Sequence, residues 1–170
     1  MLTKKNDWKV TLFRAILIIT FLIGLFYVIQ FISLGIKSES MDEDEFLKSC
    51  GRWANTYYLY LLTAVLSLVF SIVCFHSTGK VVSVIRTFFL FAGTLLLLWA
   101  TKTMNIFKKA SGVDFDDSSE VLDMYREVNR INDDEAMMSV AISLCVIVIF
   151  FVLFITSVFT LVKRAKNKKA

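Results

Sequence analysis

The sequence predicts an all-α polytopic membrane protein, an antiparallel four-helix transmembrane bundle with a small helical extracytoplasmic cap. The first observation is a set of four long segments without Asp, Glu, Lys or Arg, at residues 15–36, 53–75, 87–101 and 136–162. The second is the composition: 56% of the 170 residues are hydrophobic and 16 are Phe, as is usual for a chain solvated by lipid. The third is that the charges sort onto alternate sides of the four segments.

This sorting of charge predicts the orientation. The first, third and fifth charged segments hold 11 basic residues and one acidic residue, whereas the second and fourth hold 14 acidic and 8 basic residues. Lys and Arg accumulate in the cytoplasmic loops of membrane proteins. We therefore expect both termini to lie in the cytoplasm. The expected location is the cell membrane, that is, a plasma membrane or a bacterial inner membrane. The endoplasmic reticulum is the alternative if the source is eukaryotic.

Span length places the third helix. A hydrocarbon core of about 30 Å needs about 20 helical residues, and three of the uncharged segments meet that length. The third has only 15 uncharged residues, so its span must begin near Val81 and include Arg86. We interpret Arg86 as a boundary residue whose guanidinium snorkels to the headgroups, with a buried functional cation as the alternative. The expected spans are residues 13–36, 53–76, 81–103 and 136–162.

The remaining segments connect the spans within one membrane domain, residues 1–170. A basic start and the small residues Ser33 and Gly35 give the first span features of a cleaved signal. Its apolar stretch exceeds the roughly 7–15 residues of a secretory h-region, so we expect it to be retained. The cytoplasmic link 77–80 is short enough for a tight helical hairpin, with Gly79 as a left-handed C-cap residue.

The two outer segments, 37–52 and 104–135, are expected to be helical. Ser40 and Glu43 have the spacing of a capping box, which predicts a short helix running to Gly51 before the second span. Asp117 with Glu120 predicts a second helix start. Apolar residues then recur at helical spacing: Val121, Leu122, Tyr125, Val128 and Ile131. We expect a helical hairpin over 102–135, joined to the fourth span as one bent helix or as two helices that abut near Asn132.

The membrane segments lack the groups that most membrane chemistry requires. No Asp, Glu, Lys or His lies at mid-membrane depth in the sequence, and the single histidine, His76, lies at the cytoplasmic edge. Proton relays, ion pathways and intramembrane proteases place ionisable groups there. We therefore predict no catalytic residue, no cofactor and no metal site. Nucleic acid is not an expected partner, because no basic patch carries the interleaved aromatics that stack bases.

Small and hydroxylic residues form stripes on the spans. The stripe on the second span consists of Tyr60, Thr63, Ala64, Ser67, Ser71 and Cys74. Small residues let helices approach closely, and hydroxyl groups can form hydrogen bonds across the contact. The stripe therefore either packs the bundle internally or docks another membrane protein. We retain Ser67 and Ser71 as candidate partner-binding residues.

An acidic group in the second outer segment is the other candidate site. It comprises Asp114, Asp116, Asp117 and Glu120, followed by Tyr125. The carboxylate spacing resembles a calcium loop in outline only. Ser119 and Tyr125 stand where such a loop has its Gly and its bidentate Glu. A solvated surface or an electrostatic docking site for a partner is the expected role.

The cysteines predict no disulfide within the chain. Cys74 and Cys145 lie in spans, where a thiol packs as a small apolar group. Cys50 lies in an outward segment without an outward partner, so an intermolecular bond is the only disulfide left open.

These observations predict a non-enzymatic integral membrane interaction protein. It would be an accessory, regulatory or protective (immunity-like) subunit that acts in the lipid bilayer through a membrane-protein or extracytoplasmic partner. A homo-oligomer is also considered. The alternative is a small oligomeric channel or transport component, since hydroxyl and backbone groups can line a pore. A membrane-embedded enzyme is the third interpretation and would depend on Asp114, Asp116 or Asp117.

Overall fold

The computed structural model describes residues 7–75 and 80–167, and these ranges are helical almost throughout. The main helices are α1 (Asp7–Lys37), α2 (Glu43–Val73), α3 (Lys80–Trp99), α4 (Thr101–Ala110), α5 (Ser118–Ile131) and α6 (Met137–Asn167). A 3₁₀ turn, η1 (Ser38–Ser40), follows α1, and a π-helical segment, η3 (Asn132–Ala136), joins α5 to α6. No strand occurs in the described ranges, so the predicted all-α class is confirmed there.

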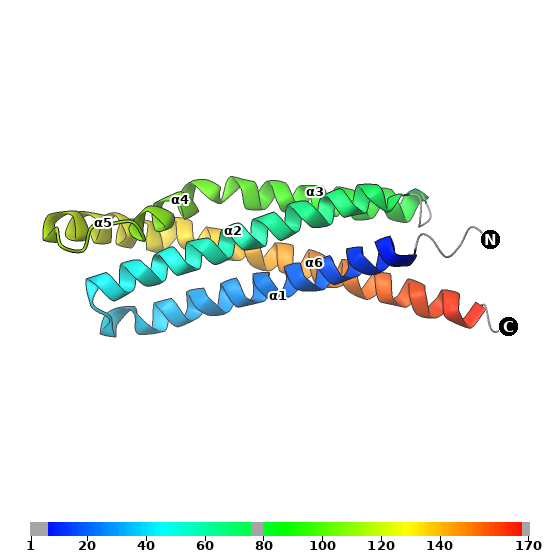
Figure 1. Cartoon of the computed structure of the whole chain (residues 1–170), viewed down its shortest axis with the longest axis horizontal. Coiled ribbons are helices and arrows are strands. Elements are labelled where there is room, and N and C mark those ends of the chain that lie inside the picture. Colours follow the sequence, from blue (N-terminus) through cyan, green and yellow to red (C-terminus); the bar gives the residue numbers. More distant parts are fainter. Residues whose placement is uncertain (1–6, 76–79, 168–170) are drawn as a thin grey trace.

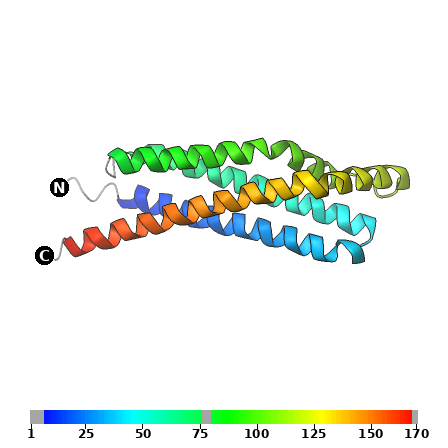
Figure 2. The ribbon, with the colours of Figure 1, turned by 180° about the vertical axis from the view of Figure 1, so that it is seen from behind.

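Helices α1, α2, α3 and α6 lie side by side along the long axis of the molecule (Figures 1 and 2). We call the end at which α1 begins and α6 ends the proximal end. Helices α4 and α5 lie towards the opposite, distal end. There α5 and the turn before it extend past the link between α1 and α2 (Figure 1).

Four helices are long and apolar enough to cross a membrane, as the sequence predicts: Trp8–Ser40, Glu43–Val73, Lys80–Trp99 and Asp134–Phe159. Their outward surfaces are apolar; the exposed fraction is 53% for Leu22, 65% for Phe88 and 60% for Val148. Lipid is the solvent that suits such a surface. Helix α3 begins at Lys80, so the predicted start near Val81 is confirmed and Arg86 lies inside this helix.

Close helix contacts depend on the small residues of the stripes. A Cβ atom placed on Gly24 of α1 would lie 2.8 Å from Cγ1 of Ile147 and 2.8 Å from Cζ of Tyr60. No side chain larger than hydrogen fits there without movement. The predicted stripe on α2 is buried along its whole length, at Tyr60, Thr63, Ala64, Ser67, Ser71 and Cys74. It therefore packs the bundle from within.

The start of α2 differs from the prediction. Asp42 is the N-cap residue, and its Oδ1 accepts a hydrogen bond from the Glu45 amide at 2.8 Å. Ser40 lies in η1, where its hydroxyl donates to the Lys37 carbonyl at 2.9 Å, so the predicted capping box is wrong. The Asp42 carboxylate takes that role because Asp42 has the extended backbone of an N-cap residue. Helix α2 then continues unbroken through Gly51, and no separate short helix precedes the span.

At the distal end, α4 and α5 are the two helices predicted between residues 102 and 135. The Tyr58 hydroxyl of α2 donates to Asn105 of α4, and the Lys108 ammonium of α4 donates to Asn55 of α2. These bonds attach α4 to α2. The π-helical η3 falls where the sequence predicts a bend or an abutment near Asn132. Gly79, the predicted C-cap residue of the 77–80 link, lies outside the described residues, so its role stays a prediction.

Candidate functional site

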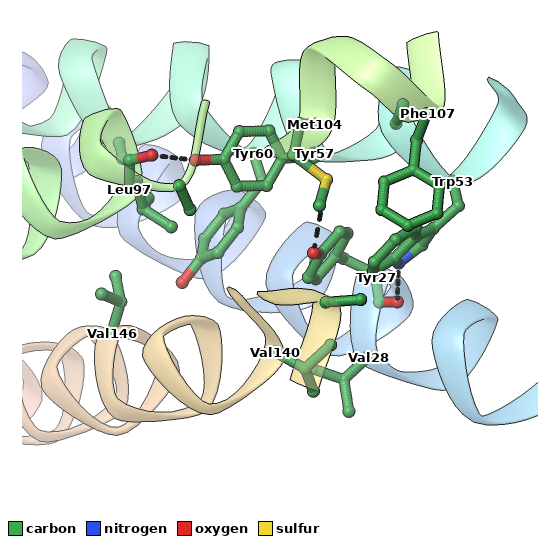
Figure 3. Close-up of a cluster of buried hydrophobic side chains, with 14 of the residues drawn as sticks. Tyr27, Val28, Trp53, Tyr57, Tyr60, Leu97, Met104, Phe107, Val140 and Val146 are labelled. Atoms are coloured by element: carbon green, nitrogen blue, oxygen red, sulfur yellow. Dashed lines mark hydrogen bonds between the residues drawn. The ribbon is translucent and has the colours of Figure 1, made fainter. Parts of the chain in front are cut away.

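The distal half of the bundle is held by a cluster of buried aromatic rings (Figure 3). The Trp53 ring stacks on Tyr27 of α1, with centroids 5.0 Å apart and planes 11° apart. Phe107 of α4 meets the same indole edge-on, at 4.9 Å and 79°. Tyr57 and Tyr60 follow Trp53 along α2 and have no exposed surface. Aromatic pairs in these geometries add stabilisation beyond the area they bury.

The polar ends of these rings are paired within the chain. The Trp53 indole Nε1 donates to the Tyr27 carbonyl at 3.2 Å, and the Tyr57 hydroxyl donates to the Leu97 carbonyl. The Tyr27 hydroxyl shares a hydrogen bond of 3.3 Å with the Ser139 hydroxyl. The cluster thus connects α1, α2, α3, α4 and α6. It is a structural junction.

Arg86 is the principal polar residue of the proximal half, and it points into the bundle. Its side chain is only 8% exposed. Nε donates to the Ser71 hydroxyl at 2.9 Å, and Nη2 donates to the Ser71 carbonyl at 3.0 Å. The guanidinium carbon lies 4.8 Å from the centre of the Phe13 ring. The snorkelling interpretation of Arg86 is therefore wrong, and the alternative of a buried cation describes its position.

The end of α2 explains this position. Helix α2 ends at Val73, so the Ser71 carbonyl lies in the last turn, where helix carbonyls need donors from outside the regular helix pattern. The negative end of the helix dipole lies at the same place and favours a cation. Arg86 supplies both the donor and the charge. We interpret this cation as a lock between α2 and α3.

Replacing Ser71 with Ala is expected to lower the free energy of unfolding by roughly 1–2 kcal/mol, because a buried guanidinium loses an acceptor. In the double variant, Arg86→Met with Ser71→Ala, the charge is absent and most of the loss should be recovered. Denaturation in mixed micelles measures both values. A double variant that is less stable than the Ser71 single variant would contradict this account of Arg86.

Ser67 and Ser71 have no exposed surface. The Ser67 hydroxyl donates to the Thr63 carbonyl at 2.9 Å and shares a hydrogen bond of 3.2 Å with Thr20 of α1. The Ser71 hydroxyl shares one of 2.9 Å with Thr87 of α3, besides its bond to Arg86. These two candidate partner-binding residues are therefore engaged with neighbouring helices of their own chain.

The acidic candidates lie at the distal end, in the turn between α4 and α5 and in the first turn of α5. Asp114, Asp116, Asp117 and Glu120 are all exposed. Asp114 Oδ1 accepts from the Asp116 amide at 3.1 Å, which closes the turn. Tyr125 is half-buried and packs edge-on against Phe46 of α2, with centroids 5.4 Å apart. Among the described residues, no three acidic, His or Cys side chains gather as a metal site.

Asp117 is the N-cap residue of α5, as the sequence predicts. Its Oδ1 accepts from the Ser119 hydroxyl at 2.6 Å, the Ser119 amide at 2.9 Å and the Glu120 amide at 3.3 Å. The Ser119 hydroxyl, followed by the two amides, lowers the pKa of Asp117 below its ordinary value. The charged form is therefore the one that stabilises the start of α5.

Because the pKa of Asp117 is lowered, we predict that the stability of the first turn of α5 depends on pH. The contribution of Asp117 is complete above the ordinary aspartate pKa of about 4, and it is lost as the pH falls through the lowered value. Asp117→Ala should remove it at every pH, which would be seen as faster hydrogen exchange at the Glu120 amide. The matched control is the exposed neighbour Asp116→Ala, which should leave that amide protected. Equal exchange in the two variants would exclude Asp117 as the cap.

Two of the three cysteines are buried and one is exposed. Cys50 has no exposed surface and Cys74 is 3% exposed, whereas Cys145 faces outward from α6. The burial of Cys50 opposes the intermolecular disulfide that the sequence leaves open. Cys50 of α2 and Cys74, the C-cap residue after α2, are thus both packed inside the bundle.

Comparisons with known protein families, curated proteins and solved structures found no match for this chain. The site must therefore be identified from its own residues. Sequence reasoning missed the aromatic junction and the direction of Arg86. The spacing of Trp53, Tyr57 and Tyr60, at four and then three residues, places them on one helix face and is the signal that could have found the junction.

Proposed function

We propose that this chain is an integral membrane interaction protein with no catalytic role, an accessory, regulatory or protective (immunity-like) subunit. It binds a protein partner through the outward face of the distal helix α5. In this proposal the four spans are antiparallel in a plasma or inner membrane and both termini are cytoplasmic. Helices α4 and α5 then form the extracytoplasmic cap. The sorting of basic and acidic residues supports this orientation.

The observation that carries the proposal is where polar groups remain available. Inside the described spans, the buried hydroxyls and Arg86 are used in hydrogen bonds within the chain. Outside them, α5 carries a charged surface, which we call the α5 face: Asp123, Arg126, Glu127 and Arg130, all exposed. Recognition chemistry is thus concentrated at the distal end.

The α5 face is suited to specific docking. Val121 and Val128 bury the opposite side of the helix, so α5 is fixed to the bundle while its charges point outward. The face carries two basic and two acidic residues. Arg126 and Asp123, 3.9 Å apart, are 70% and 81% exposed, so solvent screens their pairing and both remain open to a partner. A mixed-charge surface selects partners by complementarity and speeds their association.

Co-purification from the native membrane in mild detergent tests the proposal. The double variant Arg126→Glu with Arg130→Glu reverses the basic half of the α5 face and should abolish recovery of the partner. Lys109→Glu, an exposed charge change on α4, is the matched control and should retain it. A wild-type chain that purifies as a monomer without a partner would overturn the proposal. So would ion flux through liposomes that contain the purified chain alone.

A further inference from the structure

The charges of the α5 face form two columns along the helix. Successive residues of an α-helix are about 100° apart around its axis, because one turn takes about 3.6 residues. Seen from Asp123, Glu127 lies about 40° round in one direction, and Arg130 and Arg126 lie about 20° and 60° round in the other. The acidic residues therefore form a column on one side of the face, and the basic residues form a parallel column on the other side.

The α5 face is open to a partner along its length. Its four residues are exposed, and an open hollow of about 670 Å³ beside them is lined by α5 residues alone. Among the described residues, the one ion pair on this face joins Asp123 to Arg126 at 3.9 Å. An exposed pair of this kind contributes little in solvent, so either charge is free to pair with a partner instead.

The two columns make the α5 face complementary to itself in one arrangement. A surface that binds its own copy about a two-fold axis must be self-complementary. If two copies of α5 lie antiparallel, the axis sets each column against the same column of the other copy. If they lie parallel, the axis runs along the helices and sets the acidic column of each copy against the basic column of the other.

The parallel arrangement pairs the charges in detail. Glu127 lies opposite Arg126 of the second copy, about 1.5 Å apart in height. The two copies of Asp123 lie near the axis, and each is also within about one turn of Arg126 of the other chain. Glu127 lies within about one turn of Arg130 of the second copy in the same way. Each acidic side chain thus has a basic side chain of the other copy within reach.

The membrane imposes the same symmetry. In the orientation proposed above, two copies in one membrane cross it in the same direction, so a two-fold axis that relates them must be parallel to the membrane normal. Helix α5 runs along the long axis of the bundle in both views (Figures 1 and 2). The spans cross the membrane along that axis, so the two-fold axis also runs along α5. The arrangement that the charges require is therefore the one that two copies in a membrane adopt.

We propose that the partner bound by the α5 face is a second copy of this chain in the same membrane, held in a parallel α5 pair about a two-fold axis. This pairing rests on the proposed function, because it uses the same face and the same orientation. Val121 and Val128 bury the opposite side of α5 against its own bundle, so the two bundles lie on opposite sides of the pair. The charge pairs fix the direction and the height of one chain against the other.

Native mass spectrometry of the purified full chain in mild detergent tests this with charge reversals, and the wild-type chain should form dimers. Arg126→Glu with Arg130→Glu makes both columns acidic, and Asp123→Arg with Glu127→Arg makes both basic. Each variant alone should weaken the dimer by about tenfold or more, because like charges then face each other. A mixture of the two should form a mixed dimer, which its mass identifies. A chain with all four changes exchanges the columns and should dimerise again, and the control Lys109→Glu should leave the dimer unchanged.

Disulfide formation tests the direction of the pair. Asp123→Cys, introduced into a Cys145→Ser chain, should form a disulfide with its own copy, because position 123 lies near the axis of a parallel pair. In an antiparallel pair centred on the α5 face, the two copies of position 123 lie about 10 Å apart along the helices, which is too far for a disulfide. Lys109→Cys in the same chain is the control and should form none.

Two results would overturn the second copy as the partner: a wild-type chain that is monomeric after purification, and a dimer that persists in the all-acidic variant. A disulfide from Lys109→Cys without one from Asp123→Cys would also overturn it, because the contact would then lie elsewhere. If the co-purification experiment still recovers a different protein through the α5 face, the proposed function stands and the second copy alone is excluded. A dimer that is lost in both double variants and restored by mixing them supports the pair.

Discussion

Replacing Trp53 with Ala is expected to lower the free energy of unfolding by roughly 3–5 kcal/mol, the range measured for truncation of buried Trp and Phe. The indole is 1% exposed. It stacks on Tyr27, meets Phe107 edge-on and donates Nε1 to the Tyr27 carbonyl. Truncation leaves a cavity at the point where α1, α2 and α4 meet, and the surrounding rings cannot collapse into it fully.

Two further variants separate the causes. Trp53→Phe keeps an aromatic ring and removes the Nε1 donor, so we expect a loss of roughly 1–2 kcal/mol. Trp99→Ala removes an indole of α3 that is 64% exposed and should change stability by about 0.5 kcal/mol or less. Denaturation in mixed micelles, followed by circular dichroism, measures all three. If Trp53→Ala were no more destabilising than Trp99→Ala, the aromatic cluster would not be the junction of the bundle.

The spans could be predicted from sequence because their signal is local. The length of the uncharged segments identifies the four spans. The third segment has only 15 uncharged residues, so its span already requires Arg86 to lie inside α3. The direction of Arg86 could not be predicted, because it depends on where α2 ends. The Ser71 carbonyl that Arg86 binds lies 15 residues away in the chain.

The helix starts also differ in whether the local sequence is enough to predict them. Asp117 is correctly predicted as a cap, because its carboxylate needs only the next three residues. At α2, four consecutive acids follow Ser40, and more than one residue could cap the helix. The η1 turn decides between them, since it uses the Ser40 hydroxyl at the Lys37 carbonyl and leaves Asp42 to cap.

Gly51→Ala is expected to destabilise the protein by about 2–3 kcal/mol, although Ala is the better helix former by about 1 kcal/mol. Gly51 lies inside α2 and faces Ser111, the residue that ends α4. A Cβ atom at Gly51 would lie 2.2 Å from the Ser111 Cβ and 3.0 Å from its Cα. The second contact is with backbone, so a rotamer change cannot relieve it and α4 must move away from α2.

Gly35→Ala in α1 is the matched control, because nothing lies within 4 Å of a Cβ atom placed there. It should leave stability unchanged or raise it by up to about 1 kcal/mol. Ser111→Gly, introduced into the Gly51→Ala chain, removes the 2.2 Å contact and should restore part of the loss. Equal stability of the Gly51 and Gly35 variants would show that α4 does not depend on close contact with α2. Because the position of α4 also sets that of α5, Gly51→Ala should weaken partner recovery in the co-purification experiment, even though Gly51 is buried and lies outside the α5 face.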